Sequence, residues 1–207
     1  MRPQFIYFDV GNVLCYFSRD REVQQVVEVS GVGAQRVREV ILGEHGILWR
    51  YEAGELDHRQ FYEEFCQATD SRPEMAAFLA ADADIFTLNG SIVPLVAQLE
   101  DAQIPLGILS NTSQSHWRHL NDGRYAIVHM PFRRTVLSFE VGATKPDKRI
   151  FTRAIEAAGV APERIFYVDD LAGHVAAARS LGIDAVQYTS TDALEQELLK
   201  RGVRSNF

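Results

Sequence analysis

Three short runs of the chain are apolar at nearly every position and rich in β-branched or aromatic residues. They are QFIYFDV (residues 4–10), IPLGILS (104–110) and RIFYVDD (164–170). Two weaker runs of the same kind are RTVLSF (134–139) and DAVQY (184–188). Strands that are apolar on both faces belong to parallel sheets that helices cover. The pattern therefore predicts a parallel sheet made from these segments.

Helical patterns separate the predicted strands. In the first of them Ser91 is the expected N-cap and Pro94 lies in the first turn. The second begins after a proline and ends at Gly159, a common C-terminal signal. Alternating strands and helices predict an α/β fold, a doubly wound, Rossmann-like parallel sheet. The three helical segments are 91–103, 146–159 and 171–182.

Residues 18–88 differ from the rest because they show no convincing strand. Asp57 and Gln60 there resemble a capping box ahead of an amphipathic run. We therefore expect an inserted helical cap subdomain at 18–88, and a core made of residues 1–17 and 89–207. The predicted helices of the insert are 21–30, 34–43, 57–68 and 73–81.

Composition restricts the partners. The 207 residues are 46% hydrophobic, and 21 basic against 28 acidic side chains give a formal charge of −7. This balance argues against a nucleic-acid partner. Cys15 and Cys66 lack metal-ligand spacing, so we expect free thiols in a reducing compartment. A strand begins within the first residues and no apolar run approaches the ~20 residues of a membrane span. We expect a cytoplasmic monomer or homodimer that contacts no membrane.

Polar residues stand where the predicted strands end. Asp9 closes the first, Ser110 and Asn111 the second, and Asp169 and Asp170 the third. Each has an ordinary structural explanation, such as a helix cap or a turn. In an open parallel sheet, however, ligands bind beyond the carboxyl ends of the strands. These side chains are therefore expected to share one site.

Together the strand-end residues make chemical sense. Asp9 and Asp170 on neighbouring strands can share a Mg²⁺ ion, which prefers carboxylate and carbonyl oxygens. A hydroxyl, backbone N–H groups and the ammonium of Lys145, just before a helix, can hold a phosphoryl group. Asp9 can then attack phosphorus as a nucleophile. The expected substrate is a small phosphorylated molecule.

The motifs that carry these residues resemble the haloacid dehalogenase-like hydrolases. FDVGNVL resembles the first motif of that family, with Asp9 as nucleophile, and ILSNTS the second, with Ser110. GATKPDKRIF resembles the third, with Lys145, and FYVDDLAGHVAAARSLG the fourth, with Asp169 and Asp170. The order and spacing run along the whole chain. The insert, with WRYEAGELDHRQFYEEF, resembles the caps of small phosphatases of the family.

The resemblance implies roles for these residues. Asp9 would form an aspartyl-phosphate, and Mg²⁺ would be held by Asp9, the Gly11 carbonyl and Asp170, with Asp169 in support. The expected catalytic residues are Asp9, Ser110 and Lys145. Ser110, with Asn111, would bind the phosphoryl group, and Lys145 would neutralise its charge. The remaining expected substrate-binding residues are Gly11, Asn12 and Arg50.

One position departs from the family pattern. Most phosphatases of the family carry a second aspartate two residues after the nucleophile, where this chain has Gly11. That aspartate acts as general acid and base, help that is typically worth roughly 10²–10⁴-fold. We therefore expect a slow phosphatase that prefers good leaving groups, such as a sugar 1-phosphate, or takes its acid from elsewhere. A DxGN first motif resembles the glucose-1-phosphate phosphatase-like branch.

Two other activities stay open. A 2-haloacid dehalogenase-type hydrolase also lacks the second aspartate, but it attacks carbon without metal, whereas paired Asp169 and Asp170 suit Mg²⁺. The second alternative is a catalytically impaired protein that binds a phosphorylated ligand for regulation. The presence of all four motifs argues against it. A mutase would need the missing acid. A phosphonate-cleaving enzyme would need a lysine in the insert, and residues 18–88 contain none.

Several histidines and aromatic residues are considered as further candidates for the site. His174 stands where the fourth motif more often has Asn or Asp, and is expected to make a structural hydrogen bond or to replace the acid. Trp49 and Tyr51 are expected in the core of the insert. The three other histidines that we considered are expected in exposed stretches: His45, His116 and His119.

Overall fold

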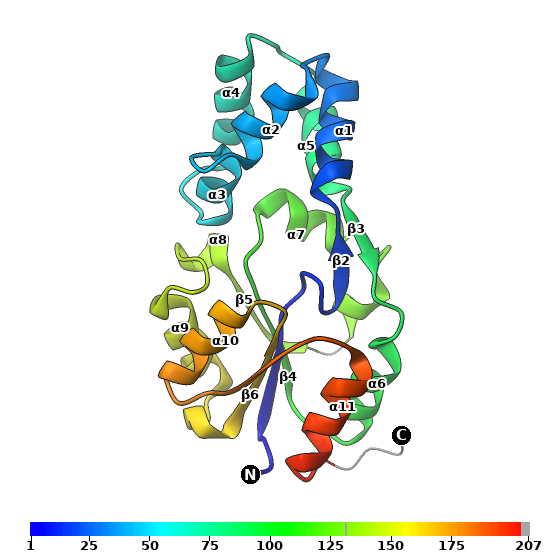
Figure 1. Ribbon diagram of the computed structural model, residues 1–207, viewed down its shortest axis with the longest axis vertical. Coiled ribbons are helices and arrows are strands. Elements are labelled where there is room, and N and C mark those ends of the chain that lie inside the picture. Colours follow the sequence, from blue (N-terminus) through cyan, green and yellow to red (C-terminus); the bar gives the residue numbers. More distant parts are fainter. Residues whose placement is uncertain (131, 204–207) are drawn as a thin grey trace.

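The five predicted strands form one parallel sheet in the computed structural model, which describes residues 1–130 and 132–203 (Figure 1). The strand order is β5-β4-β1-β6-β7, so β1 lies in the centre between β4 and β6. The fold is therefore the predicted α/β, Rossmann-like sheet. The bounds are β1 Phe5–Phe8, β4 Leu106–Ser110, β5 Phe132–Leu137, β6 Ile165–Asp169 and β7 Asp184–Gln187.

Helices cover both faces of this sheet because alternate residues of each strand point to opposite sides. Ile6 and Phe8 of β1 pack in one cluster with apolar side chains of α6 and α11. Tyr7 of the same strand packs on the other face with side chains of α9 and α10. The covering helices are α6 Val93–Asp101, α9 Lys148–Ala158, α10 Ala172–Ser180 and α11 Thr191–Lys200.

Most predicted boundaries differ by two residues or fewer from the observed ones, and one cap prediction was wrong. The N-cap of α6 is Ile92, whereas the Ser91 hydroxyl bonds to Asn89 and Thr191. Pro94 does lie in the first turn, and Gly159 ends α9 in the left-handed conformation, as predicted. The smaller elements of the core are α7 Gln114–Leu120, η1 Ala126–His129, α8 Ser138–Val141 and η2 Pro162–Arg164.

The inserted segment forms a helical bundle with an apolar cluster of its own. The capping box of Asp57 and Gln60 is present at the start of α4. Residues 47–52 form a short helix that the pattern did not predict. We call helices α1 to α5 the helical insert: α1 Arg19–Ser30, α2 Ala34–Leu42, α3 Ile47–Glu52, α4 His58–Thr69 and α5 Met75–Ala83.

Two short strands join the helical insert to the sheet, although the pattern within residues 18–88 predicted none. They are β2, Cys15–Phe17, and β3, Phe86–Leu88, and they pair antiparallel (Figure 1). Both chain crossings into the insert therefore pass through one narrow ribbon beside the carboxyl end of β1.

The helical insert also contacts the core directly. The Tyr51 hydroxyl accepts a hydrogen bond from the backbone N–H of Ser115 on α7 at 3.0 Å. Ser115 in turn donates through its hydroxyl to Asp82 of α5 at 2.7 Å. A Cβ added to Gly54 would lie 2.2 Å from the carbonyl oxygen of Phe139 on α8, so the two segments touch through backbone. These contacts hold the insert over the sheet edge.

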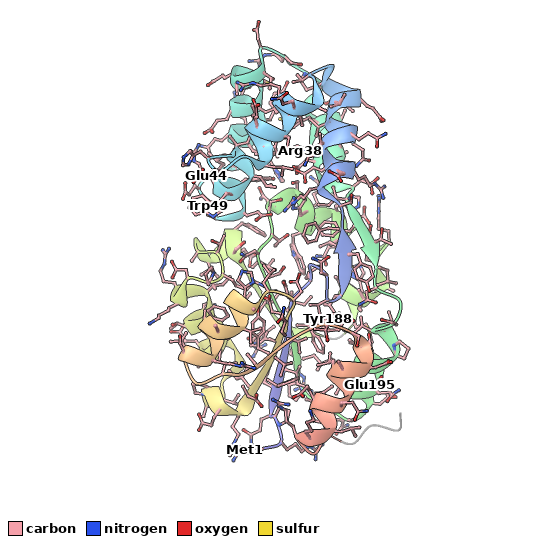
Figure 2. All side chains as sticks on the ribbon, viewed as in Figure 1. Met1, Arg38, Glu44, Trp49, Tyr188 and Glu195 are labelled. Carbon is pink, nitrogen blue, oxygen red and sulfur yellow. The ribbon has the colours of Figure 1, made fainter. Side chains whose placement is uncertain are left out.

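The expectations for individual side chains had mixed outcomes. Tyr51 is fully buried as predicted, but Trp49 is 59% exposed and lies on the outer surface of the insert (Figure 2). A six-residue helix can turn only one face inward, and here that face carries Tyr51. Cys15 and Cys66 are both buried free thiols. Among the described residues, no helix has the length and apolar character that crossing a membrane requires.

Candidate active site

The carboxyl ends of three adjacent strands bring the predicted residues together. Asp9 directly follows β1, Ser110 ends β4 and Asp169 ends β6. The backbone N–H of Asp9 still donates to the Val168 carbonyl at 2.9 Å, so the ladder continues to the edge of the site. The position of each side chain is thus fixed by the register of the sheet.

Lys145 connects the two acidic strand ends. Its ammonium lies 2.9 Å from Asp9 Oδ1 and 2.8 Å from Asp169 Oδ2, and it donates to the Leu109 carbonyl at 3.1 Å. The side chain is only 3% exposed. We call Asp9, Lys145 and Asp169 the strand-end cluster.

Asn111 holds the loop that carries Lys145. Its Oδ1 accepts from the Lys145 backbone N–H at 2.7 Å, and its Nδ2 donates to the Lys145 carbonyl at 3.0 Å. Both ends of the amide are therefore engaged within the protein. Asn111 lines the same cavity as Asp9, but its clearest role is to position the lysine.

Burial and mutual charge set the protonation states of the strand-end cluster. Burial raises the pKa of Asp9 to about 6, although the Lys145 ammonium opposes this shift and the Asp169 carboxylate adds to it. Burial also favours a higher pKa for Asp169, but Lys145 and His174 outweigh it and lower the pKa. Burial lowers the pKa of Lys145, yet the two carboxylates raise it overall. Two carboxylates around one ammonium leave a negative site that favours a cation.

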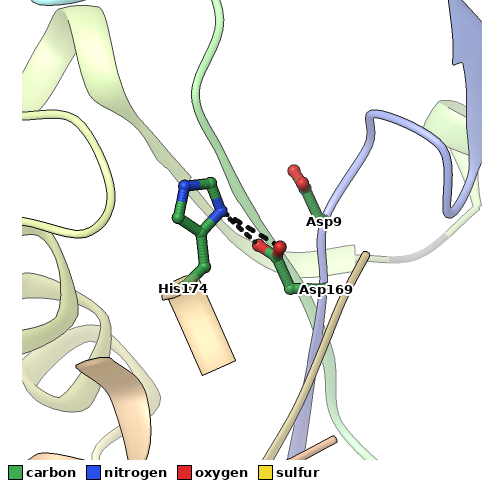
Figure 3. Close-up of side chains that lie close together, drawn as sticks. All are labelled: Asp9, Asp169 and His174. Carbon is green, nitrogen blue, oxygen red and sulfur yellow. Dashed lines mark hydrogen bonds and ion pairs between the residues drawn. The ribbon is translucent and has the colours of Figure 1, made fainter. Parts of the chain in front are cut away.

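Asp169 accepts hydrogen bonds from several donors, of which Figure 3 shows His174. His174 Nδ1 lies 3.0 and 3.1 Å from its two oxygens, the Leu171 N–H donates at 2.8 Å, and the Tyr167 hydroxyl also donates to it. The second ring nitrogen of His174 lies on the side of the ring away from Asp9 in this view. The structural hydrogen bond expected of His174 is therefore present.

The donor set fits a magnesium ion. Ligand atoms of Asp9, Asp169 and His174 lie within 4.8 Å of one another, but those of Asp169 are already engaged. Asp170 is less buried and is held by Asn12, whose Nδ2 donates to Asp170 Oδ2 at 2.9 Å. Carboxylate oxygens of Asp9 and Asp170 are the hard ligands that Mg²⁺ prefers. Asp169 is better suited to orient Lys145 than to ligate.

The space beside Gly11 is already occupied. A Cβ added at Gly11 would lie 3.1 Å from Phe17 Cε1. The Phe17 ring is in turn covered by the Arg19 guanidinium, 5.0 Å from the ring centroid. A residue larger than glycine would require the Phe17 ring, and the guanidinium on it, to shift by a few tenths of an ångström.

A cavity of about 260 Å³ extends from the strand-end cluster to the helical insert. Asp9, Gly11 and Ser110 line one end of it. The opposite side, which we call the insert-facing wall, consists of Arg19 of α1, Glu52 of α3 and His116 of α7. The prediction that His116 is exposed was wrong, because it is 2% exposed beneath the insert.

The sequence offered no local signal for the insert-facing wall. Arg19 and Glu52 are 33 positions apart in different helices, and the wall forms only when the insert lies over α7. The only nearby pattern is the i,i+3 pair of Arg19 and Glu22, which many surface helices show. Tertiary packing alone gives these residues their position.

Arg50 does not reach the cavity. Its guanidinium pairs with Glu64 at 2.6 Å and with Glu55 at 3.4 Å on the surface of the insert. Arg19 is the arginine that lines the cavity, where its guanidinium pairs with Glu52 at 3.1 Å. The structure therefore brings Arg19, and not Arg50, to the site.

Comparison with known proteins identifies the family. Residues 5–182 match the haloacid dehalogenase-like hydrolases, and the chain belongs to this family of enzymes. A haloacid dehalogenase family enzyme from Bacteroides thetaiotaomicron, solved with magnesium and inorganic phosphate, superimposes with a TM-score of 0.80 at 23% identity. That match covers 90% of this chain and 94% of the other.

Two curated relatives are also similar. A glyceraldehyde 3-phosphate phosphatase from Methanopyrus kandleri is 35% identical over 80 residues, which are 38% of this chain and 33% of that protein. Acyl-CoA dehydrogenase family member 10 from Mus musculus is 25% identical over 202 residues, 93% of this chain and 18% of that protein. The chain thus spans no more than about a third of the length of either relative.

Proposed function

We propose that this protein is a Mg²⁺-dependent phosphatase that hydrolyses a small phosphorylated metabolite through an aspartyl-phosphate on Asp9. The observation that carries the proposal is the strand-end cluster, where a buried ammonium lies between two buried carboxylates at 2.9 and 2.8 Å. Lys145 neutralises charge on the transferring group and Asp169 fixes the direction of the ammonium. Such preorganised charge is the main source of catalysis in phosphoryl transfer.

Each step uses groups of this chain. An oxygen of Asp9 attacks phosphorus, the bond between phosphorus and the leaving oxygen breaks, and water later cleaves the aspartyl-phosphate to release phosphate. Ser110, buried at the end of β4 and lining the cavity, would donate to a phosphoryl oxygen. When bound by Asp9, the Gly11 carbonyl and Asp170, Mg²⁺ would neutralise further phosphoryl charge.

Gly11 determines which esters react well. Without an aspartate at this position, no side chain next to the nucleophile protonates the leaving oxygen. A leaving group of low pKa needs no proton, so aryl phosphates and sugar 1-phosphates are the preferred substrates. The Phe17 and Arg19 stack, packed where that side chain would begin, agrees with a site adapted to glycine.

The comparisons support this proposal from two directions. The relative from Methanopyrus kandleri is a phosphatase, and the solved structure from Bacteroides thetaiotaomicron holds magnesium and inorganic phosphate. The helical insert would serve as the cap that excludes water from the cavity. Residues 18–88 as cap and residues 1–17 with 89–207 as core remain the division we propose.

The test is phosphate release from aryl phosphates, sugar 1-phosphates and sugar 6-phosphates, with Mg²⁺ and with a chelator. We expect release that requires metal, is fastest for the first two classes and disappears in Asp9→Asn. Asp192→Asn, on the exposed first turn of α11, is the matched control and should keep full activity. Metal-independent dehalogenation of a 2-haloacid, with no phosphate release, would replace the proposal by the dehalogenase alternative.

A further inference from the structure

The insert-facing wall contains an imidazole with an unused acceptor. His116 Nε2 lies 3.2 Å from the carbonyl oxygen of Asp82, which can only accept, so Nε2 carries the proton. Nδ1 therefore presents a lone pair. Within residues 1–130 and 132–203 no donor reaches it, and Glu52 Oε1, which is an acceptor, lies 4.0 Å away.

The surroundings keep this imidazole neutral. Burial, and secondly the Arg19 guanidinium, lower the pKa of His116 to about 3, and His119 adds to the shift. Asp82 lies 3.7 Å from Nε2, but burial and the neighbouring Glu22 raise the pKa of its carboxyl well above the ordinary range. With Nε2 holding the single proton of the neutral ring, Nδ1 stays an acceptor at neutral pH. Glu52 Oε1 already accepts from Arg19 at 3.1 Å, whereas His116 Nδ1 has no donor among the described residues.

Charge at the wall is nearly balanced. Arg19 donates to Glu22 at 2.7 Å and to Glu52 at 3.1 Å, and its guanidinium lies over Phe17, so its positive charge is paired with two carboxylates. A second anionic group of a ligand would therefore compete with Glu22 and Glu52 for this guanidinium. A ligand that satisfies the wall must bring donors and no negative charge at this point.

We propose that Glu52 and His116 are the specificity-determining residues for the leaving group, and that they select an uncharged sugar or polyol. This inference rests on the phosphatase proposed above. A hydroxyl of the leaving group donates to His116 Nδ1 or Glu52 while the phosphoryl group lies at the strand-end cluster. Both residues line the same cavity as Asp9, and its volume of about 260 Å³ suits a small metabolite.

The selection works in two ways. Hydroxylated leaving groups gain hydrogen bonds that an aryl group cannot form. Leaving groups with a second phosphate meet the Glu52 carboxylate, and the cation beside it, Arg19, is already paired with two carboxylates. A site built for a hydroxyl strongly rejects analogues without one, because its polar groups are left unpaired. Glu52 and His116 thus favour uncharged, hydroxylated leaving groups, in addition to the preference for leaving groups of low pKa that Gly11 sets.

The experiment measures binding, so that it does not depend on turnover. Calorimetric titration of Asp9→Asn with Mg²⁺ uses three probes: α-D-glucose 1-phosphate, phenyl phosphate and α-D-glucose 1,6-bisphosphate. We expect the glucose 1-phosphate to bind about tenfold or more tightly than either of the others. Adding Glu52→Gln, which keeps the shape of the side chain, should remove most of both preferences.

Controls separate the outcomes. Glu64→Gln on the outer surface of the insert should leave all three affinities unchanged. Thermal melting verifies that each variant folds, and Glu52→Asp provides a second test if Glu52→Gln does not. Equal binding of the three probes, or an equal change in all of them in Glu52→Gln, would overturn this inference alone. Failure of all three to bind would overturn the phosphatase proposal and this inference with it.

Discussion

The two ends of the cavity are built in different ways. At the strand-end cluster, Asp9, Lys145 and Asp169 hold each other at 2.8–2.9 Å on the edge of a five-stranded sheet. At the insert-facing wall, His116 Nδ1 lies 4.0 Å from Glu52 Oε1, and no donor in the described part of the chain reaches Nδ1. The charged groups of the first end pair with one another, whereas the second end keeps one acceptor, His116 Nδ1, that no described residue satisfies.

This difference suits the two ends to different tasks under our proposal: the strand-end cluster to the reaction and the insert-facing wall to the choice of substrate. A saturated network is rigid, which suits the transfer of a phosphoryl group whose geometry is the same in every substrate. A wall with open acceptors gains most when a ligand supplies the donors. Since Arg19 and Glu52 lie on helices joined to the sheet by the short ribbon of β2 and β3, this part of the wall can vary while the strand ends stay fixed.

The largest effect is expected at Lys145. In Lys145→Met the carboxylates of Asp9 and Asp169 lose their shared cation, and breaking a buried ion pair in this way costs about 3–5 kcal/mol of stability. Activity should fall about 100-fold or more, since charge stabilisation is lost. Denaturant unfolding and phosphate release measure the two effects. Lys148→Met, exposed at the start of α9, is the control, and an equal loss there would contradict the central role of Lys145.

Gly11→Asp tests whether the acid can simply be restored. Because its Cβ would meet Phe17 at 3.1 Å, the single variant should lose about 1–3 kcal/mol of stability and gain little activity on alkyl phosphates. Gly11→Asp with Phe17→Leu has room for the carboxylate and should gain about tenfold or more on these esters. The measurement is the rate of phosphate release from alkyl and from aryl phosphates in both variants. A full gain in the single variant would show that the stack does not exclude the side chain.

The next effect is the pH dependence of the free energy of unfolding that His116 causes. The pKa of His116 is lowered to about 3 in the fold but is near 6.5 when unfolded, so below pH 6.5 only the unfolded chain takes up the proton. His116 therefore costs stability as pH falls from 6.5 to 3, by about 1.4 kcal/mol per pH unit. His116→Gln should be less stable than the parent at pH 7.5, and this difference should shrink by that amount per unit between pH 6 and 4. Urea unfolding at each pH measures it; a constant difference would mean that His116 is not held neutral.

The smallest effect is expected at Arg50. Its guanidinium pairs with Glu55 and Glu64 on the surface, and exposed pairs contribute about 0–1 kcal/mol. Arg50→Ala should change kcat/KM by less than about twofold, whereas Arg19→Ala should impair substrate binding. Steady-state kinetics of the two variants compare the arginines directly. A larger loss in Arg50→Ala would place it in the site after all.

The strand-end cluster could be predicted from the sequence because its position follows from few rules. A run of apolar residues makes a buried parallel strand, the strand ends meet at one edge, and the polar residue after each run must then lie there. Asp9, Ser110 and Asp169 required nothing more. Lys145 followed from its place just before a helix in the third motif.

The insert-facing wall could not be predicted because no local pattern encodes it. β2 and β3 have three residues each and form only because they pair across about seventy positions. His116 has ordinary polar neighbours in sequence, and α5 buries it only after the insert has folded over α7. Arg19 and Glu52 likewise meet through tertiary packing.

The central claim is that Asp9 carries the phosphoryl group during turnover. Without an aspartate at position 11 to activate water, hydrolysis of the aspartyl-phosphate should be slow enough for it to accumulate. The most direct measurement is mass spectrometry of the protein quenched in acid during turnover of phenyl phosphate with Mg²⁺. We expect one phosphoryl group on the peptide that contains Asp9, and none in Asp9→Asn. Steady release of phosphate with no such adduct, or with the adduct on another residue, would contradict the account.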